Sequence, residues 1–501
     1  MDNLIDNKAD TAPITKILMI KMVWCLALSL FWVIFLWGVW DRGVYALGIN
    51  AFLFWLSALA LFFWVLKHEK HYNSRDLVWL IPLGLIALSF SLYENPFIKG
   101  VNMLLYPLLF AALFNFGFLS GKEKRDWNLN FIFHFLKRFL VLVTKVNSAV
   151  THYFDFLLPK DQKKKRIFKK IMIGTLLFAA LASVLIVPLL SSADAEFSAR
   201  MELMYDWIGE LISETLVYKI IVFFVLAIIL FSALLAWGRR FDYQEKEPSK
   251  KEIDPIISGI VIGGTLGLYL LFLWVQIGRL WVGSLPFDFR ETEDIVKSGF
   301  WQLLFLSVVN IAIYFFTYRK TIPSVQRLLA VFTAASLLLL LSAGERMGLY
   351  VAYYGFSYEK FFASYTVLYC GILFVWLIYR LFRAERANIL KFLVLLFLWM
   401  FSVVTIFPVE QFIFRANIKL SGLKDSRIRL FEMTMLSPDV LGIVKRSREQ
   451  GALKEKTFYL EREGGADPDR VFDWSPWIEK QTKRLADKKW YEKNIMDALV
   501  R

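Results

Sequence analysis

Long apolar stretches recur along most of the chain. Between residues 17 and 407, runs of 16 to 25 mostly apolar residues alternate with short segments rich in charged or turn-forming residues. Runs of this length fit helices that cross the hydrocarbon core of a bilayer. We predict eleven membrane-spanning helices, at residues 17–40, 44–66, 77–92, 101–119, 171–190, 216–237, 256–281, 300–317, 328–344, 361–382 and 390–407.

Residues 129–158 form a further apolar segment, but it carries a polar stripe. Its polar side chains recur every three or four residues with one gap, at Asn130, His134, Lys137, Arg138, Lys145, Ser148, His152 and Asp155. A helix with one apolar face and a face containing Lys and Arg lies in the headgroup region of a membrane. We therefore predict an interfacial amphipathic helix on the cytoplasmic side, not a twelfth crossing.

The basic residues indicate the orientation. Residues 120–170 contain 13 Lys and Arg, whereas residues 191–215 contain six acids and only Arg200. Loops rich in Lys and Arg stay in the cytoplasm. This places the N-terminus and the basic loop 120–170 inside, and eleven crossings then place the C-terminus outside.

The C-terminal segment, residues 408–501, differs from the rest because it is polar and lacks a spanning run. Ser437 and Pro438 fit the start of a helix, with Ser as N-cap and Pro at the first helical position. We predict a transmembrane helical domain over residues 1–407, followed by a small helical tail on the extracytoplasmic side.

Composition agrees with an all-α polytopic integral membrane protein. Of 501 residues, 57% are hydrophobic and 17% aromatic, and the formal net charge is +15. Basic residues beside a membrane attract anionic lipid, so we expect the bilayer, with anionic lipid at the cytoplasmic face, as the partner. No nucleic-acid recognition motif accompanies the charge, and we expect no nucleic-acid partner.

The sequence offers little for metal or cofactor chemistry. There are four histidines and two cysteines, and both cysteines, Cys25 and Cys370, lie inside apolar runs. The motifs of phosphate loops, zinc proteases and serine hydrolases do not occur. We therefore assign no catalytic residues, no metal ligands and no cofactor.

Charged and amide residues within or beside apolar spans are the remaining candidates, because they are costly in lipid and need a partner or a cavity. In the predicted orientation they gather near the outer side. Those in or beside the short link between the third and fourth spans are Glu94, Asn95, Lys99 and Asn102, and those at later spans are Arg279, Glu345, Arg346 and Glu359.

Adjacent Glu345 and Arg346 cannot simply pair if the helix continues, because neighbouring residues project in different directions. Arg279, at matching depth, is the candidate partner of Glu345. Glu359, the tail or an anionic group would then face Arg346.

Four uncharged residues complete the candidate ligand-binding cluster. Tyr350 and Tyr354 either wall the site or belong to an interfacial belt, and Gln276 and Asn310 either line it or form interhelical hydrogen bonds. The whole cluster is either a network that locks helices together or a ligand site.

Several segments resemble a family of bacterial multi-pass membrane proteins, the domains of unknown function 4153 and 4173. LWVQIGRLWVGSLPFDFRETEDIVKSGFWQLLFLSVVNIAIYF resembles its central signature, with Gly299, Phe300, Trp301 and Asn310 matching. In LSAGERMGLYVAYYGFSYEKFFASY the residues Tyr354 to Ser357 match a family turn, and FRANIKL and MLSPDVLGIV resemble tail segments. The resemblance covers roughly residues 80–445. It departs at ETEDIVK and at Ala416, which precedes Asn417 where the family has Tyr.

The resemblance implies a fold and a membrane setting, and no activity. We expect a bacterial inner-membrane protein that acts as a sensing, scaffolding or envelope-maintenance component with an outward-facing polar cluster, and with an envelope protein as a further partner. The alternatives are a transporter of a small molecule or lipid and an intramembrane transferase acting on lipid-linked groups. An enzyme is the less favoured class, because the candidate acids have no nearby His, Cys or metal set.

Overall fold

The computed structural model describes residues 16–68, 78, 80–117, 129–157, 162–211, 213–237, 253–276, 289–318, 320–383, 388–423, 426, 428, 430–451, 453 and 473–499. The regular elements in these ranges are all helical. They are α1 (Lys16–Phe31), α2 (Val39–Arg42), α3 (Ile49–His68), α4 (Leu80–Leu92), α5 (Pro96–Gly117), α6 (Leu129–Leu157), α7 (Gln162–Leu181), α8 (Val187–Ala193), α9 (Ala195–Leu211), α10 (Glu214–Trp237), α11 (Pro255–Gln276), α12 (Phe289–Thr317), α13 (Pro323–Tyr354), α14 (Tyr358–Arg383), α15 (Ile389–Ile406), α16 (Val409–Ser421), α17 (Leu441–Glu449), α18 (Ser475–Ala486) and α19 (Ile495–Leu499).

Within the described ranges, nine helices are long and apolar enough to cross a membrane. They include α1 with its π-helical continuation η3 (Trp32–Leu36), and α3, α5 and α10 to α15. The chain is therefore a polytopic membrane protein. The prediction of eleven crossings also counted residues 77–92 and 171–190. The first of these contains only the 13-residue helix α4, which is about 20 Å long, and the second falls on α7, a π turn and α8, which are not among the nine.

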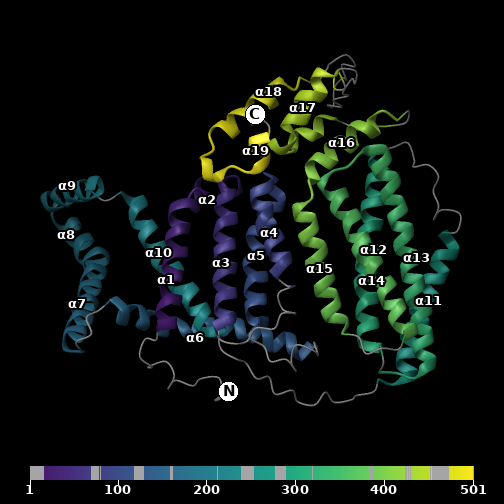
Figure 1. The fold of residues 1–501 in the computed structure, drawn as a ribbon, viewed down its shortest axis with the longest axis horizontal. Coiled ribbons are helices and arrows are strands. Elements are labelled where there is room, and N and C mark those ends of the chain that lie inside the picture. The colour runs from purple at the N-terminus through teal and green to yellow at the C-terminus, as the bar shows by residue number, and fades with distance from the viewer. Residues whose placement is uncertain are drawn as a thin grey trace.

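The helices form two groups that each have their own apolar core. The first core joins α1, α3, α4, α5, α6 and α10, and the second joins α11 to α15. α15 belongs to both, because Leu398 packs into the first core and Ile389 into the second. In Figure 1, α15 stands between the two groups, while α7 to α9 lie to one side of the other helices.

The predicted amphipathic helix is present as α6, which runs across one end of the first group (Figure 1). Its inner face packs on α10, where Tyr153 Oη donates a hydrogen bond to the Ala227 carbonyl at 3.3 Å. Its outer face exposes Leu140 and Val143. Two residues of the predicted polar stripe, Lys145 and His152, are buried, at 6% and 7% exposed, so the stripe does not all face outward. The location of α6 in the headgroup region stays a prediction.

The C-terminal segment packs on the opposite end of the bundle from α6 (Figure 1). A third apolar core holds it there, in which Val409 and Phe414 of α16 meet Trp474 and Trp477. Ser437 caps the short 3-10 turn Pro438–Val440 that leads into α17, as its sequence predicts. The tail is thus a helical layer fixed to the bundle.

Candidate functional site

Glu345 and Arg346 do not end their helix, because α13 continues through them to Tyr354. Glu345 lies 22 residues after Pro323, roughly 33 Å along the helix, which is close to the hydrocarbon thickness of a bilayer. Both side chains are half-buried. Arg279 lies outside the described residues, so the proposed pair between Arg279 and Glu345 stays a prediction.

Asn310 makes interhelical hydrogen bonds. Its Oδ1 accepts from Tyr269 Oη of α11 at 2.7 Å, and its Nδ2 donates to Ser336 Oγ of α13 at 2.8 Å. Asn310 is 3% exposed, so these bonds satisfy a polar group that burial would otherwise penalise. The residue therefore ties three helices together. Gln276 is the last residue of α11, and its side chain lies outside the described part of the chain.

Tyr350 and Glu359 line a cavity of about 500 Å³, which we call the outer cavity. It lies between the two helix groups, since Phe97 of α5 forms one wall. The other lining residues come from α12, α13 and α14 and are Phe300, Trp301, Leu304, Met347, Tyr350, Tyr358, Glu359, Lys360, Phe362, Ala363 and Thr366. Pockets at the junction of two structural units are a common place for ligands.

Lys360 places a cation in the lining of the outer cavity, next to the carboxylate of Glu359. Its Nζ lies 4.2 Å from the ring centre of Tyr350 and donates to the carbonyl oxygens of Tyr354 and Gly355, at 3.3 and 3.0 Å. A cation over an aromatic face is stabilised by the ring electrons. Of the predicted tyrosines, Tyr350 is therefore a wall residue, while Tyr354 packs beside it with ring centres 5.3 Å apart.

The turn after α13 is bound by the tail. Gly355 has φ +73°, and the Asn417 side chain of α16 both accepts from the Phe356 amide, at 2.6 Å, and donates to its carbonyl, at 2.9 Å. A Cβ at Gly355 would lie 2.6 Å from Asn417 Oδ1. Glycine is needed here for its backbone angle and for this close approach.

Charged side chains are buried where the link between α4 and α5 meets the tail. We call the six residues Glu94, Lys99, Glu410, Asp439, Lys488 and Asp497 the buried junction; each is at most 7% exposed. Glu94 Oε2 accepts from Lys99 Nζ at 3.0 Å, Lys488 Nζ at 2.5 Å and Asn494 Nδ2 at 2.9 Å. Lys488 also bonds Asp497, at 2.8 Å. Charges removed from water require this kind of mutual pairing.

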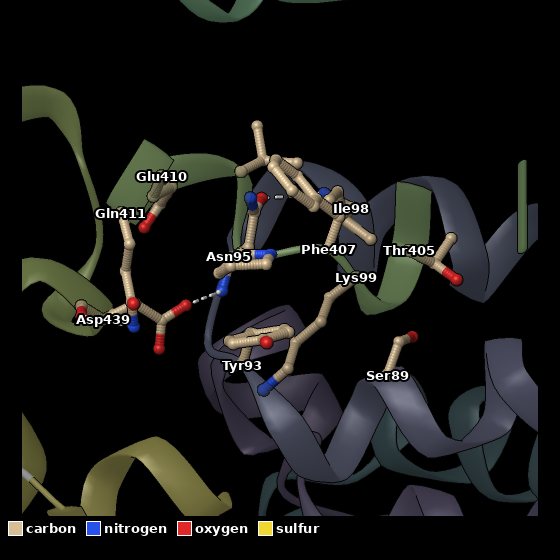
Figure 2. Close-up of a pocket in the computed structure, with 12 residues that line it drawn as sticks. Ser89, Tyr93, Asn95, Ile98, Lys99, Thr405, Phe407, Glu410, Gln411 and Asp439 are labelled. Atoms are coloured by element: carbon tan, nitrogen blue, oxygen red, sulfur yellow. Dashed lines mark hydrogen bonds between the residues drawn. The ribbon is translucent and has the colours of Figure 1, made fainter. Parts of the chain in front are cut away.

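Asp439 holds the start of α5. Its carboxylate accepts from the backbone amides of Glu94, at 2.8 Å, and Asn95, at 3.1 Å. Figure 2 shows Asp439 and Asn95 facing each other across this contact. Asn95 in turn accepts from the Ile98 amide at 3.0 Å, and Pro96 follows it, so the local sequence fits a capped helix start.

Glu410 of α16 connects the outer cavity to the tail. One of its oxygens accepts from Tyr358 Oη, and the other accepts from Ser437 Oγ and from the Ser437 amide at 3.0 Å. Tyr358 also lines the outer cavity. A single carboxyl group therefore bridges a cavity wall and the turn that begins α17.

The buried junction has more acids than bases, with four carboxyl groups and two lysines. Burial, followed by the charge of Asp439, raises the pKa of Glu410 well above its usual value. Burial also raises the pKa of Asp439 to about 7, although the Glu94 amide opposes this. Burial alone would lower the pKa of Lys488, but the charges of Glu94 and Asp497 outweigh it and the pKa is raised.

A second cavity lies beside the buried junction and has a volume of about 10 Å³ (Figure 2). Glu410, Asp439, Asn95 and Lys99 are among its lining residues. This is room for about one water molecule. Two carboxyl groups therefore converge on one space, but that space does not accommodate a substrate.

Comparison with known protein families gives a match to most of the chain. The model of a domain of unknown function, DUF4153, matches residues 80–445, which is most of the chain. The chain belongs to the DUF4153 family. Searches of curated proteins and of solved structures found no match to this DUF4153 chain.

The segments that resemble the family meet in space. Asn417 of FRANIKL binds the turn at Gly355, and Ser437 and Asp439 of MLSPDVLGIV bind Glu410 and the α4–α5 link. Phe300 and Trp301 line the outer cavity. These segments are thus gathered at the end of the bundle covered by the tail.

Sequence reasoning found one side of the buried junction and missed the other. Glu94, Asn95, Lys99 and Asn102 stood out because they interrupt apolar spans. Their tail partners gave no comparable signal, because Lys488 and Asp497 lie in an ordinary polar segment nearly 400 residues away. Among the residues that the structure describes, no group of three or more His, Cys, Asp or Glu is placed to hold a metal ion.

Proposed function

We propose that this protein is a sensing component of the bacterial inner membrane. In this proposal the outer cavity binds the polar end of an anionic amphipathic ligand, and the tail responds to it. The observation that carries the proposal is the position of Tyr358, which lines the outer cavity while its hydroxyl group binds Glu410 on the tail helix α16. A ligand that displaces Tyr358 therefore acts directly on the contact between Glu410 and Ser437.

The lining of the outer cavity supports an amphipathic ligand. Phe97, Phe300 and Phe362 provide apolar walls, and Lys360 provides a cation beside the carboxylate of Glu359. A pocket of this kind binds a ligand through apolar burial and orients it through a few polar groups. The buried junction supports the second half of the proposal, since it fixes the tail to α4 and α5 and makes the tail part of the same body as the cavity.

The setting of the protein forms part of the proposal. The basic loop 120–170 faces the cytoplasm and contacts anionic lipid together with α6, which lies in the headgroup layer. The tail lies on the outer side, where an envelope protein is its partner. The basic residues that outnumber acids in this loop support this orientation.

Hydrogen exchange tests the proposal in protein reconstituted into phosphatidylcholine vesicles with and without phosphatidylglycerol. We expect the anionic lipid to speed exchange at tail residues 433–447, because a ligand that displaces Tyr358 removes one hydrogen bond from Glu410 and loosens its contact with Ser437. We expect Lys360→Gln to remove this difference. Lys320→Gln is the matched control, because Lys320 lies between α12 and α13 at the other end of the bundle. Equal tail exchange in both vesicles for the unmodified protein would refute the proposal.

Neither alternative function gains support from the cavities. A transferase on lipid-linked groups needs carboxyl groups that converge on a substrate-sized space, whereas Glu410 and Asp439 converge on about 10 Å³. A transporter needs polar groups along a path near the membrane midplane, whereas the cavity inside the first helix group has an apolar lining.

A further inference from the structure

The first helix group contains an apolar cavity of about 360 Å³, distinct from the outer cavity. Its walls come from α1, α3, α4, α5, α6 and α10. The lining side chains that the structure describes are Leu, Ile, Ala, Phe, Trp, Met and Pro, together with the Cys25 thiol. We call it the inner cavity. It is independent of the function proposed above, because no residue lines both cavities.

An empty space of this size and chemistry is unfavourable. The cost of an apolar cavity rises with its volume, because the lining atoms lose packing contacts. An apolar cavity of roughly 150 Å³ stays free of water and binds benzene. The inner cavity is more than twice as large, and its lining gives water no set of hydrogen-bond partners, so a hydrocarbon is the fitting occupant.

The shape favours a chain over a compact molecule. Along α3 the lining runs from Ala51 to Phe62, which is roughly 17 Å and about the depth of one leaflet of a ~30 Å hydrocarbon core. Met103 of α5 and Ile229 of α10 line the cavity and are also 36% and 44% exposed. The exposure of these two lining residues points to an opening of the cavity between α5 and α10.

Two helix irregularities border the inner cavity. α1 passes into the π turn Trp32–Leu36, and both end residues of that turn are lining residues. Pro107 interrupts the hydrogen-bond pattern of α5 and also lines the cavity. π turns within helices occur frequently at functional sites, and here one of them lies in the cavity wall.

We propose that the inner cavity binds a single hydrocarbon chain of a membrane lipid, which enters from the bilayer between α5 and α10. The chain is the acyl or isoprenyl tail of a lipid whose headgroup stays at the membrane surface. Cys25, Trp32, Phe54, Ala58 and Phe110 surround it. Recognition rests on apolar burial and on the length of the cavity.

A cavity-filling substitution tests this proposal. Ala58 on α3 lines the inner cavity, and Ala60 on the same helix faces outward. The full chain is purified in mild detergent, and its extracted lipids are quantified per protein by mass spectrometry. We expect Ala58→Phe to lower the retained lipid at least about fivefold, because the added ring occupies the chain site, and Ala60→Phe to leave it unchanged. Alkaline hydrolysis of the extract separates acyl esters from isoprenyl lipids.

Equal lipid retention by the Ala58→Phe and Ala60→Phe proteins overturns the proposal. If Ala58→Phe lowers the monodisperse yield, the milder pair Ala58→Leu and Ala60→Leu replaces it. A photoreactive phosphatidylcholine with a diazirine in one acyl chain gives a further readout in vesicles of the unmodified protein. Adducts at Phe54 and Phe62 support the site, whereas adducts confined to the outward residues Leu53 and Leu56 contradict it.

Discussion

Glu94 is the residue on which most of the buried junction depends. One carboxylate oxygen accepts three hydrogen bonds, from Lys99, Lys488 and Asn494, and none of these groups reaches solvent. The two lysines have been removed from water, so their charges are stabilised by the protein alone. A buried pair of this kind is costly to break from one side, because the remaining partner stays charged in a poor solvent.

Replacing Glu94 by Gln should therefore destabilise the protein by about 3 to 5 kcal/mol. The amide keeps the size of the side chain but removes the charge that balances Lys99 and Lys488. Thermal unfolding of the detergent-solubilised protein, followed by size-exclusion chromatography, measures the loss. Glu196→Gln is the control, because Glu196 pairs with Arg200 on the exposed surface of α9 and should have no measurable effect. Equal stability of the two variants would show that the junction does not hold the tail.

The link between α13 and α14 shows how element ends decide the arrangement. Both helices run longer than a hydrocarbon core requires, and the four-residue region from Tyr354 to Ser357 reverses the chain beneath α16. The Phe356 amide and carbonyl lie outside a helix, and the Asn417 side chain supplies a hydrogen-bond partner to each of them. The tail thus completes the hydrogen bonding of the bundle at this turn.

Substituting Gly355 by Ala should destabilise this turn by about 1 to 3 kcal/mol. The positive φ disfavours any side chain, and the new Cβ would overlap Asn417 Oδ1. Thermal unfolding and the exchange rate of the Phe356 amide measure the effect, and the amide should exchange faster. Gly348→Ala, within α13 where a Cβ meets open space, is the control. An unchanged Phe356 exchange rate in the Gly355 variant would contradict this account.

At the scale of the whole molecule, the tail joins both helix groups. It binds the α4–α5 link of the first group through Asp439 and Lys488. It binds the α13–α14 turn and the start of α14 in the second group through Asn417 and Glu410. Two of these four contacts use carboxyl groups with a raised pKa. The attachment of the tail is therefore expected to depend on pH.

The contribution of Asp439 to stability should fall as pH rises from about 4 to about 7. Between its usual pKa and its raised value of about 7, the folded protein holds a proton that the unfolded chain has released. Rising pH therefore favours unfolding, by at most about 1.4 kcal/mol per pH unit for one proton. The charged or titratable groups that face this carboxyl group include Tyr93, Glu94, Lys99 and Glu410.

Measuring unfolding at several pH values, for the unmodified protein and for Asp439→Asn, isolates the contribution of Asp439 titration to stability. As pH rises across this window, the unmodified protein should lose stability relative to Asp439→Asn, because Asn has no proton to release. A difference that stays constant from pH 4.5 to 7 would exclude the titration of Asp439 as its source.

The sequence by itself determined the helical membrane class, most helix positions, the amphipathic character of α6 and the family. Apolar runs, a polar stripe and Ser437 with Pro438 are local patterns, and local patterns follow from helix geometry and from the cost of polar groups in lipid. The same cost marked Glu94, Lys99 and Asn310 as residues in need of partners.

Only the tertiary structure decided which groups meet. It gave Asn310 the interhelical bonds to Tyr269 and Ser336, and it joined Glu94 to Lys488 across 394 residues. It also carried α13 past Glu345 and Arg346, because a helix ends where its backbone bonds end and not where its apolar residues do. Pairing between distant segments depends on how helices pack, and a polar residue in a polar tail gives no sign of the partner that it will meet.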